Sequence, residues 1–184
     1  MMARAFLVAV ALLGLAEIGR FAWIQGKGWL GQELLERAWN RAGDAPNRPW
    51  PGARTRPAAR LYVPELQLDR LVVEGVETPN LAWGPGIATG ANGHTLIAAH
   101  RDTHFAFLGR LEVGHSLSLE RANGALQQWQ VTEARIVDSR TTALDLDAPG
   151  PLLTLITCWP IDAVEAGGPL RLVVSAEPAA GERS

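Results

Sequence analysis

Residues Leu152–Pro160 read LLTLITCWP, an uncharged run of apolar and threonine residues that contains Cys158, the only cysteine among the 184 residues. Turn-forming residues flank the run, with PGP at 149–151 before it and Pro160 at its end. A short, partly β-branched apolar stretch between turn residues is typical of a buried strand. We therefore expect Cys158 at the C-terminal mouth of a strand.

Similar short apolar segments recur along the chain from residue 60 onward, separated by turn residues. The pair Asn123-Gly124 between two of them is a strong signal for a tight hairpin. No helical pattern of comparable length appears there, although residues 78–83 could form one helical turn. Short strands at this spacing predict an all-β domain, a closed or nearly closed barrel. The predicted strands cover residues 60–63, 68–73, 94–99, 116–119, 126–131, 134–138, 152–157 and 170–176.

The first 25 residues predict a membrane anchor or signal segment. Residues 5–24 are mostly apolar, and 20 residues at about 1.5 Å each match a bilayer core of about 30 Å. Glu17 and Arg20 interrupt the stretch, but they share a helix face and can partly neutralise each other near one interface. A cleaved signal peptide is the alternative, and the lack of a convincing small-x-small cleavage site favours the uncleaved anchor. In either case the remaining chain is expected outside the cytoplasm.

Two segments connect this anchor to the barrel. Residues 26–43 have the apolar spacing of an amphipathic helix, which could lie on the membrane surface or pack on the following domain. Residues 44–58 contain four prolines and predict a semi-rigid, extended linker. The barrel is expected over residues 59–178, followed by a tail over residues 179–184.

Composition excludes several classes of function. The formal net charge of −2 provides no basic footprint for nucleic acid. One cysteine cannot form an internal disulfide, so the cellular compartment must be inferred from the N-terminal segment. A hydrophobic content of 47% is sufficient for a folded core.

Two further residues have the chemistry that a catalytic thiol needs. His100 directly follows the apolar segment at 94–99, so it ends a strand, as Cys158 does. An imidazole can deprotonate a thiol and later protonate a leaving amine. Arg171 lies near the start of the apolar segment LRLVVSA, where its guanidinium could bind a substrate carbonyl or a developing oxyanion. The alternative for Arg171 is a solvent-facing strand position.

Two other readings of these residues remain open. Free cysteines often behave as small core hydrophobes, so the domain could be a non-catalytic extracytoplasmic binding module with Cys158 in its core. A less supported alternative is a metal hydrolase in which His100 and His104, four residues apart, share a metal ion with His94 and His115. An HxxxH pair works best on a helix, and no HExxH motif is present.

Three segments resemble the three active-site motifs of the sortase family, in the same order. They are AHRDTHF at 99–105, TLITC at 154–158 and PLRLVV at 169–174. Sortases are membrane-anchored cysteine transpeptidases with a closed eight-stranded β-barrel, and the resemblance covers residues 59–177. The lead-in helix, the linker and the ending GGPLRLVVSAEP look most like the proteobacterial, marine-type subgroup.

The resemblance implies a role for each matching residue. Cys158 corresponds to the nucleophile, His100 to the general acid and base, and Arg171 to the group that stabilises the oxyanion. Three positions depart from the family pattern: an alanine stands where glycine is usual before the histidine, His94 stands where asparagine is common, and a tryptophan stands where tyrosine often follows the cysteine. The loop at 84–93 is also shorter than in many relatives. The residues expected to line the substrate groove are Thr157, Ala99 and Trp159.

The implied reaction is acyl transfer in two steps. The thiolate would attack the carbonyl between threonine and glycine of an LPXTG-like sorting signal, and an amine, or failing that water, would release the thioacyl group. The implied partners are a protein that carries the signal, an unidentified amine acceptor and the membrane. The implied location is the inner membrane, with a single span and a periplasmic catalytic domain. We expect no cofactor, no metal ion and no nucleic acid.

Overall fold

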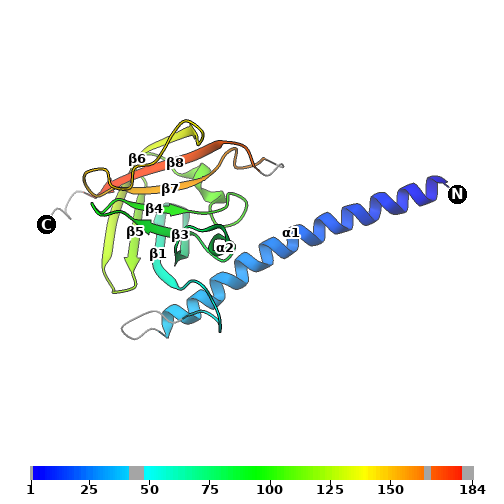
Figure 1. The fold of residues 1–184 in the computed structure, drawn as a ribbon, viewed down its shortest axis with the longest axis horizontal. Coiled ribbons are helices and arrows are strands. Elements are labelled where there is room, and N and C mark those ends of the chain that lie inside the picture. The colour runs from blue at the N-terminus through cyan, green and yellow to red at the C-terminus, as the bar shows by residue number, and fades with distance from the viewer. Residues whose placement is uncertain (1, 42–47, 164–166, 180–184) are drawn as a thin grey trace.

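The computed structural model describes residues 2–41, 48–163 and 167–179, and consists of one long helix and a β-barrel (Figure 1). The helix, α1, covers Met2–Asn40. Three short helices lie in the loops of the barrel: η1 (Pro64–Leu66), α2 (Thr78–Leu81) and η2 (Ala106–Arg110). The strands are β1 (Pro57–Val63), β2 (Leu68–Glu74), β3 (Gly86–Thr89), β4 (Thr95–Ala98), β5 (Ser116–Arg121), β6 (Leu126–Asp138), β7 (Leu153–Cys158) and β8 (Leu170–Pro178).

The strands form a closed barrel in the order β1-β2-β3-β4-β7-β8-β6-β5, with β5 returning to β1. Two neighbouring pairs, β2 with β3 and β4 with β7, are parallel, and the other pairs are antiparallel. The predicted all-β, closed eight-stranded barrel is confirmed. The parallel pairing of β4 with β7 matters for function, because parallel strands bring their C-terminal ends to the same edge of a sheet.

The predicted and observed strands differ at two places. No strand is predicted over residues 84–93, but these residues contain β3. Within this strand the backbone of Gly86 lies against the backbone of Gly75. A Cβ at position 86 would clash with the carbonyl oxygen of Gly75, so this position requires glycine. The predicted segments at 126–131 and 134–138 form one strand, β6, with a register shift between Val131 and Glu133.

The barrel interior is filled by alternate residues of the strands. Along β1 buried and partly buried residues alternate strictly, which places Leu61 and Val63 inside. Leu153 and Leu155 of β7 are also fully buried, as is Phe105 in the loop after β4. Each such side chain contributes roughly 1.5–3 kcal/mol of transfer free energy. The interior is therefore a packed core, and any reaction must take place at an edge of the barrel.

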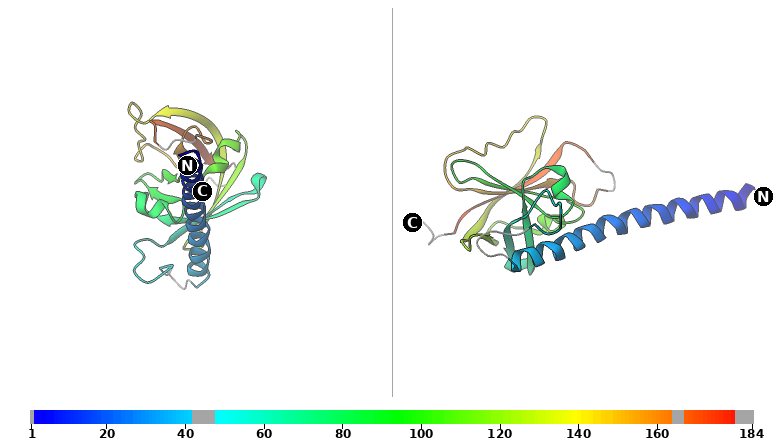
Figure 2. Two further views of the ribbon diagram at one scale, coloured as in Figure 1. Left: turned by 90° about the vertical axis from the view of Figure 1, so that its right-hand side faces the viewer. Right: turned by 60° about the horizontal axis from the view of Figure 1, so that its bottom comes forward.

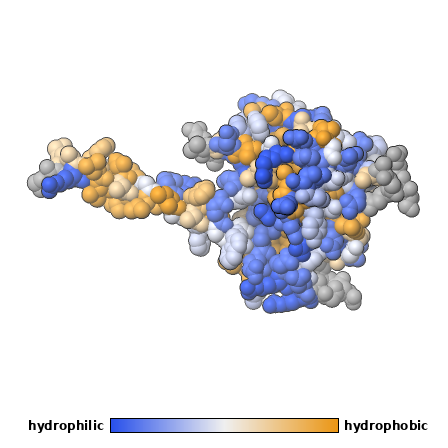
Figure 3. Space-filling model, turned by 180° about the vertical axis from the view of Figure 1, so that it is seen from behind, coloured by the Kyte–Doolittle hydropathy of each residue, from blue (hydrophilic) through white to orange (hydrophobic). Residues whose placement is uncertain are grey.

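One continuous helix, α1, covers both the predicted anchor and the amphipathic helix that the sequence predicts as a separate segment. The N-terminal part of α1 projects away from the barrel in Figure 1 and in the right-hand view of Figure 2. Its surface is largely apolar (Figure 3), and the helix is long and apolar enough to cross a membrane by length and composition. Large exposed hydrophobic residues on this part include Phe6, Leu7, Leu12, Leu13, Leu15, Ile18 and Phe21.

The C-terminal part of α1 is packed against the barrel. Gly28, Gly31, Leu35 and Ala38 are buried on one face of the helix, three to four residues apart. Leu35 forms a small core of its own with residues of β2. This half of α1 therefore behaves as part of the barrel domain.

A side-chain amide completes the contact between α1 and β2. The Gln32 Nε2 atom donates to the carbonyl oxygen of Leu71 at 3.0 Å, and the Leu71 amide donates to Gln32 Oε1 at 2.9 Å. Close by, Arg60 Nη1 donates to Glu36 Oε1 at 3.0 Å. The amide of Gln32 thus gives Leu71 the pair of hydrogen bonds that a neighbouring strand would give.

The predicted linker is only partly described, since residues 42–47 lie outside the described residues. The rest of it does not extend freely, because Ala53 and Thr55 are buried and Thr55 Oγ1 donates to the carbonyl oxygen of Glu74 at 2.8 Å. The ring of Trp50 lies 4.6 Å from that of Trp83, centroid to centroid. Of the predicted tail at 179–184, the structure describes only residue 179.

Candidate active site

The parallel pairing of β4 and β7 brings His100 and Cys158 to the same edge of the barrel. Ala98 is the register partner of Ile156, so each candidate residue lies two positions beyond a paired residue. The chains stay together past the end of the ladder, because the amide of Ala99 donates to the carbonyl oxygen of Ile156 at 3.3 Å. The two strand ends predicted from the sequence are therefore neighbours.

Arg171 joins this edge from the other side of β7. It is the register partner of Cys158 in the antiparallel pair of β7 and β8. The pairing continues beyond the cysteine, where the Trp159 amide donates to the carbonyl oxygen of Leu170 at 3.0 Å. His100, Cys158 and Arg171 thus end or begin three adjacent strands, β4, β7 and β8.

The surroundings of Cys158 differ from those of a core cysteine. Both Cys158 and His100 are partly buried, so a ligand can reach them while the barrel shields part of each side chain from water. The core cysteine of the binding-module alternative would be fully buried. A partly exposed thiol on an edge of the barrel that also carries a histidine and an arginine is instead compatible with nucleophilic chemistry.

Arg171 is held by the backbone of its own loop. Its Nη1 atom donates to the carbonyl oxygens of Gly168 and Leu170, each at 2.8 Å. These contacts use Nη1, whereas a guanidinium carries five N–H donors on three nitrogen atoms. The loop therefore fixes the position of the cation next to the cysteine-bearing strand.

Thr157 and Ala99, two of the three residues predicted to line the groove, support the site from inside. Thr157 Oγ1 donates to the carbonyl oxygen of Ala99 at 2.8 Å, and both residues are buried, at 3% and 6% exposure. This bond joins the residue before the cysteine to the residue before the histidine. Trp159, the third predicted groove residue, is partly exposed and packs against the core.

Sequence reasoning missed the contribution of Arg101. This arginine is 7% exposed, and its Nη2 atom donates to the carbonyl oxygen of Ala163 in the loop between β7 and β8 at 3.1 Å. The backbone turn that contains Arg101 is closed by the Phe105 amide, which donates to the carbonyl oxygen of His100 at 3.0 Å. The only available signal was an arginine directly after the histidine, in a segment that looked like an exposed polar loop.

His94 does not join His100 and His104 in one site, so the three-histidine metal site drawn from the sequence is wrong. His94 precedes β4 whereas His100 follows it, so the strand separates them. His94 is buried, with Nε2 at 2.8 Å from Thr154 Oγ1 and Nδ1 at 2.9 Å from the carbonyl oxygen of Asp145. Within residues 2–41, 48–163 and 167–179, no group of three histidine, cysteine, aspartate or glutamate side chains is placed to hold a metal ion.

His104 lies beneath the site, between the turn after β4 and α1. It is 5% exposed, and its Nε2 atom has no hydrogen-bond partner among the described residues. Burial, and to a smaller extent the positive charges of Arg70 and His100, lower the pKa of His104 from 6.5 to about 4. His104 is therefore neutral at neutral pH.

A cavity of about 320 Å³ opens beside His100. Its walls come from α1, from the residue after α2 and from the turn after β4. The lining residues are Ile24, Lys27, Ala82, His100, Asp102 and Thr103.

Comparison with known proteins gives one consistent result. Residues 61–179 match the sortase domain family. Sortase D of Bacillus subtilis (strain 168) is 29% identical over 120 residues, which are 62% of this chain and 60% of that protein. The chain thus spans about three fifths of the length of this curated relative.

Solved structures support the fold. The sortase D5 transpeptidase of Clostridium perfringens aligns with a TM-score of 0.59 at 17% identity, covering 83% of this chain and 98% of that one. Sortase A of Listeria monocytogenes aligns with a TM-score of 0.56 at 22% identity, covering 66% of this chain and 86% of that one. Because the family match extends over more than half of the sequence and includes all three strand ends of the candidate site, the chain belongs to the sortase family.

Proposed function

We propose that the protein is a membrane-anchored cysteine transpeptidase that cleaves an LPXTG-like sorting signal between threonine and glycine and transfers the acyl part to an amine. The observation that carries this proposal is the register of β4, β7 and β8, which aligns His100, Cys158 and Arg171 along one edge of the barrel. Membership of the sortase family supplies the substrate class.

In the first step the Cys158 thiolate attacks the carbonyl carbon of the substrate threonine, and a C–S bond forms. The negative charge that develops on the carbonyl oxygen is stabilised by the Arg171 guanidinium. The C–N bond then breaks as His100 donates a proton to the departing glycine amine. The product of this step is a thioacyl group on Cys158.

In the second step an incoming amine attacks the thioacyl carbon while His100 accepts its proton. The C–S bond breaks and Cys158 leaves as a thiolate, which restores the starting enzyme. Water takes the place of the amine when no acceptor is bound, and the outcome is then hydrolysis. The same imidazole thus handles the proton of both the leaving amine and the entering amine.

The burial of Thr157 and Ala99 favours positioning roles for both residues. The hydrogen bond between them holds the two catalytic strand ends together, whereas Trp159 is accessible enough to contact a bound peptide. We assign Trp159 to the substrate groove on this ground. Its large ring at this position narrows the choice of side chains that the groove can accept.

We further infer that α1 is an uncleaved, single-pass anchor in the inner membrane, with the catalytic barrel in the periplasm of a proteobacterial host. The continuity of the helix supports the anchor, because the apolar part runs without a break into the part that packs on the barrel. Cleavage of a signal peptide would have to cut through this helix. The Bacillus relative supports membership of the sortase family but does not test the proteobacterial subgroup. The subgroup is therefore part of this proposal.

The reaction is tested by mass spectrometry of the full chain in detergent micelles, incubated with an LPXTG-type peptide. We expect a thioacyl adduct on Cys158 and cleavage after threonine, and the Cys158→Ala variant should form neither. His100→Ala should slow adduct formation by at least about 100-fold, the usual contribution of general acid catalysis. The absence of both adduct and cleavage, together with a Cys158 that resists alkylation by iodoacetamide in the folded protein, would favour the binding module.

A further inference from the structure

The cavity beside His100 lies on the side of this residue that faces away from Cys158. In the barrel β4 stands between β3 and β7. Cys158 ends β7, whereas Ala82, a lining residue, precedes β3. A substrate that extends across the strand ends would therefore meet Arg171, Cys158, His100 and the cavity in that order.

This order along the strand ends indicates where each half of the substrate is bound. The acyl half is bound where its carbonyl can meet Cys158 and Arg171. The leaving amine and the entering amine both exchange a proton with His100, and must therefore come within about 3 Å of its ring. The cavity beyond His100 is thus the space for the amine half of the reaction.

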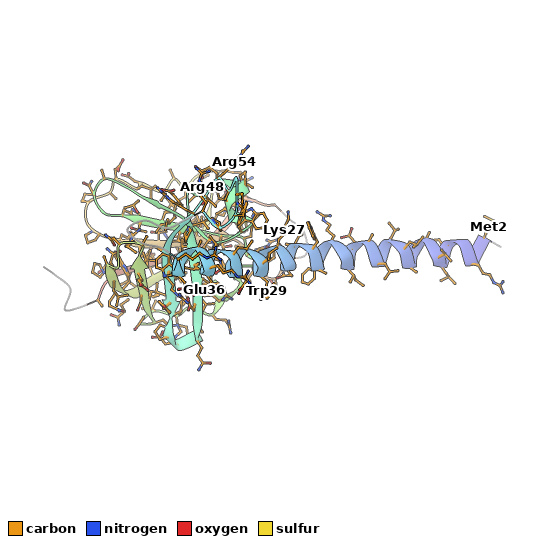
Figure 4. The ribbon with its side chains drawn as sticks, turned by 90° about the horizontal axis from the view of Figure 1, so that it is seen from below. Met2, Lys27, Trp29, Glu36, Arg48 and Arg54 are labelled. Atoms are coloured by element: carbon orange, nitrogen blue, oxygen red, sulfur yellow. The ribbon has the colours of Figure 1, made fainter. Side chains whose placement is uncertain are left out.

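The anchor helix supplies two of the cavity's lining residues, Ile24 and Lys27. Figure 4 shows Lys27 on α1 where the helix reaches the barrel. The Lys27 ammonium lies 5.5 Å from the ring centroid of Trp23 and 5.8 Å from that of Trp83. Cation–π contacts at these distances favour a position of the charged group next to the barrel.

Close contacts on both sides of Lys27 fix the helix in this position. Gln25 Nε2 donates to the carbonyl oxygen of Asp102 at 2.8 Å. A Cβ at Gly28 would lie 3.4 Å from His104 Cε1, and a Cβ at Gly31 would lie 2.5 Å from the carbonyl oxygen of Trp83. The contact at Gly28 is an ordinary van der Waals distance, whereas the approach at Gly31 is possible only for glycine, so Gly31 helps to determine the register of α1 over the cavity.

The charges around the cavity favour a particular type of amine. Lys27 provides a positive charge and Asp102, which is exposed, a negative charge in the same lining. An entering ammonium group is attracted by Asp102 and then deprotonated by His100. A carboxylate a few bonds away from that nitrogen would be attracted by Lys27. A simple alkylamine would gain only the first of these interactions.

We propose that α1 forms one wall of the amine-binding subsite and that Lys27 selects amine substrates that carry a carboxylate close to the nucleophilic nitrogen. This proposal rests on the transpeptidase function proposed above. It makes the membrane anchor a part of the active site, and Lys27 a specificity-determining residue.

The test compares two acceptors of nearly equal size with the full chain in detergent micelles and an LPXTG-type peptide. One acceptor is diglycine, which has a free carboxylate, and the other is diglycine amide, which does not. The Lys27→Gln variant should lower kcat/KM for diglycine by about tenfold, the effect expected for loss of one charge-assisted contact. The value for diglycine amide should change less than twofold. Comparing each acceptor with itself removes any difference in amine basicity.

Arg54→Gln is the matched control, because it removes one positive charge from an exposed residue outside the cavity lining. It should change neither acceptor. The Ile24→Trp variant, which fills part of the cavity, should raise KM for both acceptors to a similar extent. Loss of space in the cavity therefore affects diglycine and diglycine amide alike, whereas loss of the Lys27 charge affects diglycine alone.

Three results would overturn the proposal in distinguishable ways. If the wild-type chain forms no thioacyl adduct, the transpeptidase function fails and this inference fails with it. If the adduct forms but Lys27→Gln leaves both acceptors unchanged, only the role of Lys27 is wrong. If Lys27→Gln weakens both acceptors equally, Lys27 supports the fold of the site and does not select a carboxylate.

Discussion

His104 is a buried imidazole in contact with the anchor helix. It lies against Gly28 of α1, and its Nε2 atom has no hydrogen-bond partner among the described residues. The charged groups that act on it are Arg70 on β2, His100 at the end of β4 and Asp102 in the turn; the two cations lower its pKa and the carboxylate raises it. Burial outweighs all three, so protonation of His104 works against the folded state.

We expect this histidine to destabilise the fold in mild acid. Its pKa falls from 6.5 to about 4 on folding, so between these two values the unfolded chain binds more protons than the folded one. The stability associated with neutral His104 is complete above pH 6.5 and is lost as the pH falls toward 4. The loss amounts to at most about 3 kcal/mol.

Urea unfolding of the full chain between pH 4 and pH 8 measures this effect. The His104→Leu variant cannot titrate at this position, so its free energy of unfolding should fall less steeply in acid than that of the wild type. Parallel pH profiles for the two proteins would show that His104 is not responsible.

At the scale of single residues, the sequence predicted the candidate catalytic residues but not the contacts that hold them in position. Cys158, His100 and Arg171 could be proposed because each stands at the end or start of an apolar run, and strand ends can be read locally. The bond between Thr157 and Ala99 depends on the register of two strands nearly 60 residues apart in the chain, which no local pattern reveals. For the same reason His94 looked like a neighbour of His100, although β4 separates them.

Among the helices and strands, α1 is the one whose two halves lie in different surroundings. Its first half has the composition of a membrane span. Its second half packs on β2 through Leu35 and lies close to the backbone of Trp83 at Gly31. The apolar pattern therefore changes from all-round to one-sided near Gln25 while the backbone continues. That change of pattern predicted a boundary between two segments where the structure has an unbroken helix.

Two glycines of α1 allow a controlled test of its docking. A Cβ at Gly31 would meet the backbone of Trp83 at 2.5 Å, so Gly31→Ala should push the helix away and lower the free energy of unfolding by about 1–3 kcal/mol. A Cβ at Gly26 would meet nothing within 4 Å, and Gly26→Ala should stabilise the helix by up to about 1 kcal/mol.

Urea unfolding of both variants against the wild type provides the comparison. Opposite signs for two identical substitutions five residues apart would establish that the packing of α1 contributes to stability. Equal effects would mean that the helix is not held against Trp83 in solution.

For the whole molecule, the unbroken helix would set the height of the candidate active site above the membrane if α1 is the proposed anchor. Ile24 belongs to the apolar stretch and also lines the cavity beside His100, so the proposed amine subsite would then lie near the membrane surface. If α1 is rigid, the distance between the bilayer and the active site is a fixed property of the fold. A substrate attached to the same membrane must then have a spacer that matches this distance.

An insertion can change that distance by a known amount. Eleven polar, helix-forming residues inserted after Ala22 should raise the barrel by about 16 Å and preserve its rotation, because eleven residues make about three turns. In lipid nanodiscs, the shortest spacer that permits cleavage of a lipid-tethered LPXTG-type peptide should increase by a similar length.

The same peptide free in solution is the control, and its cleavage should not depend on the insertion. An unchanged spacer requirement would contradict a rigid anchor.

The two hydrogen bonds between the Gln32 side-chain amide and the Leu71 backbone have a consequence for how the protein is made. β3 pairs with β2 only at Val73 and Glu74 within the described ladder, so Gln32 covers backbone groups that would otherwise form an open sheet edge. Open edges attract strands of other chains and promote aggregation. Because α1 is synthesised before β2, the protecting group is already present when the vulnerable strand leaves the ribosome. The residues that match the family domain, 61–179, lack this protection, since it comes from the helix that precedes them.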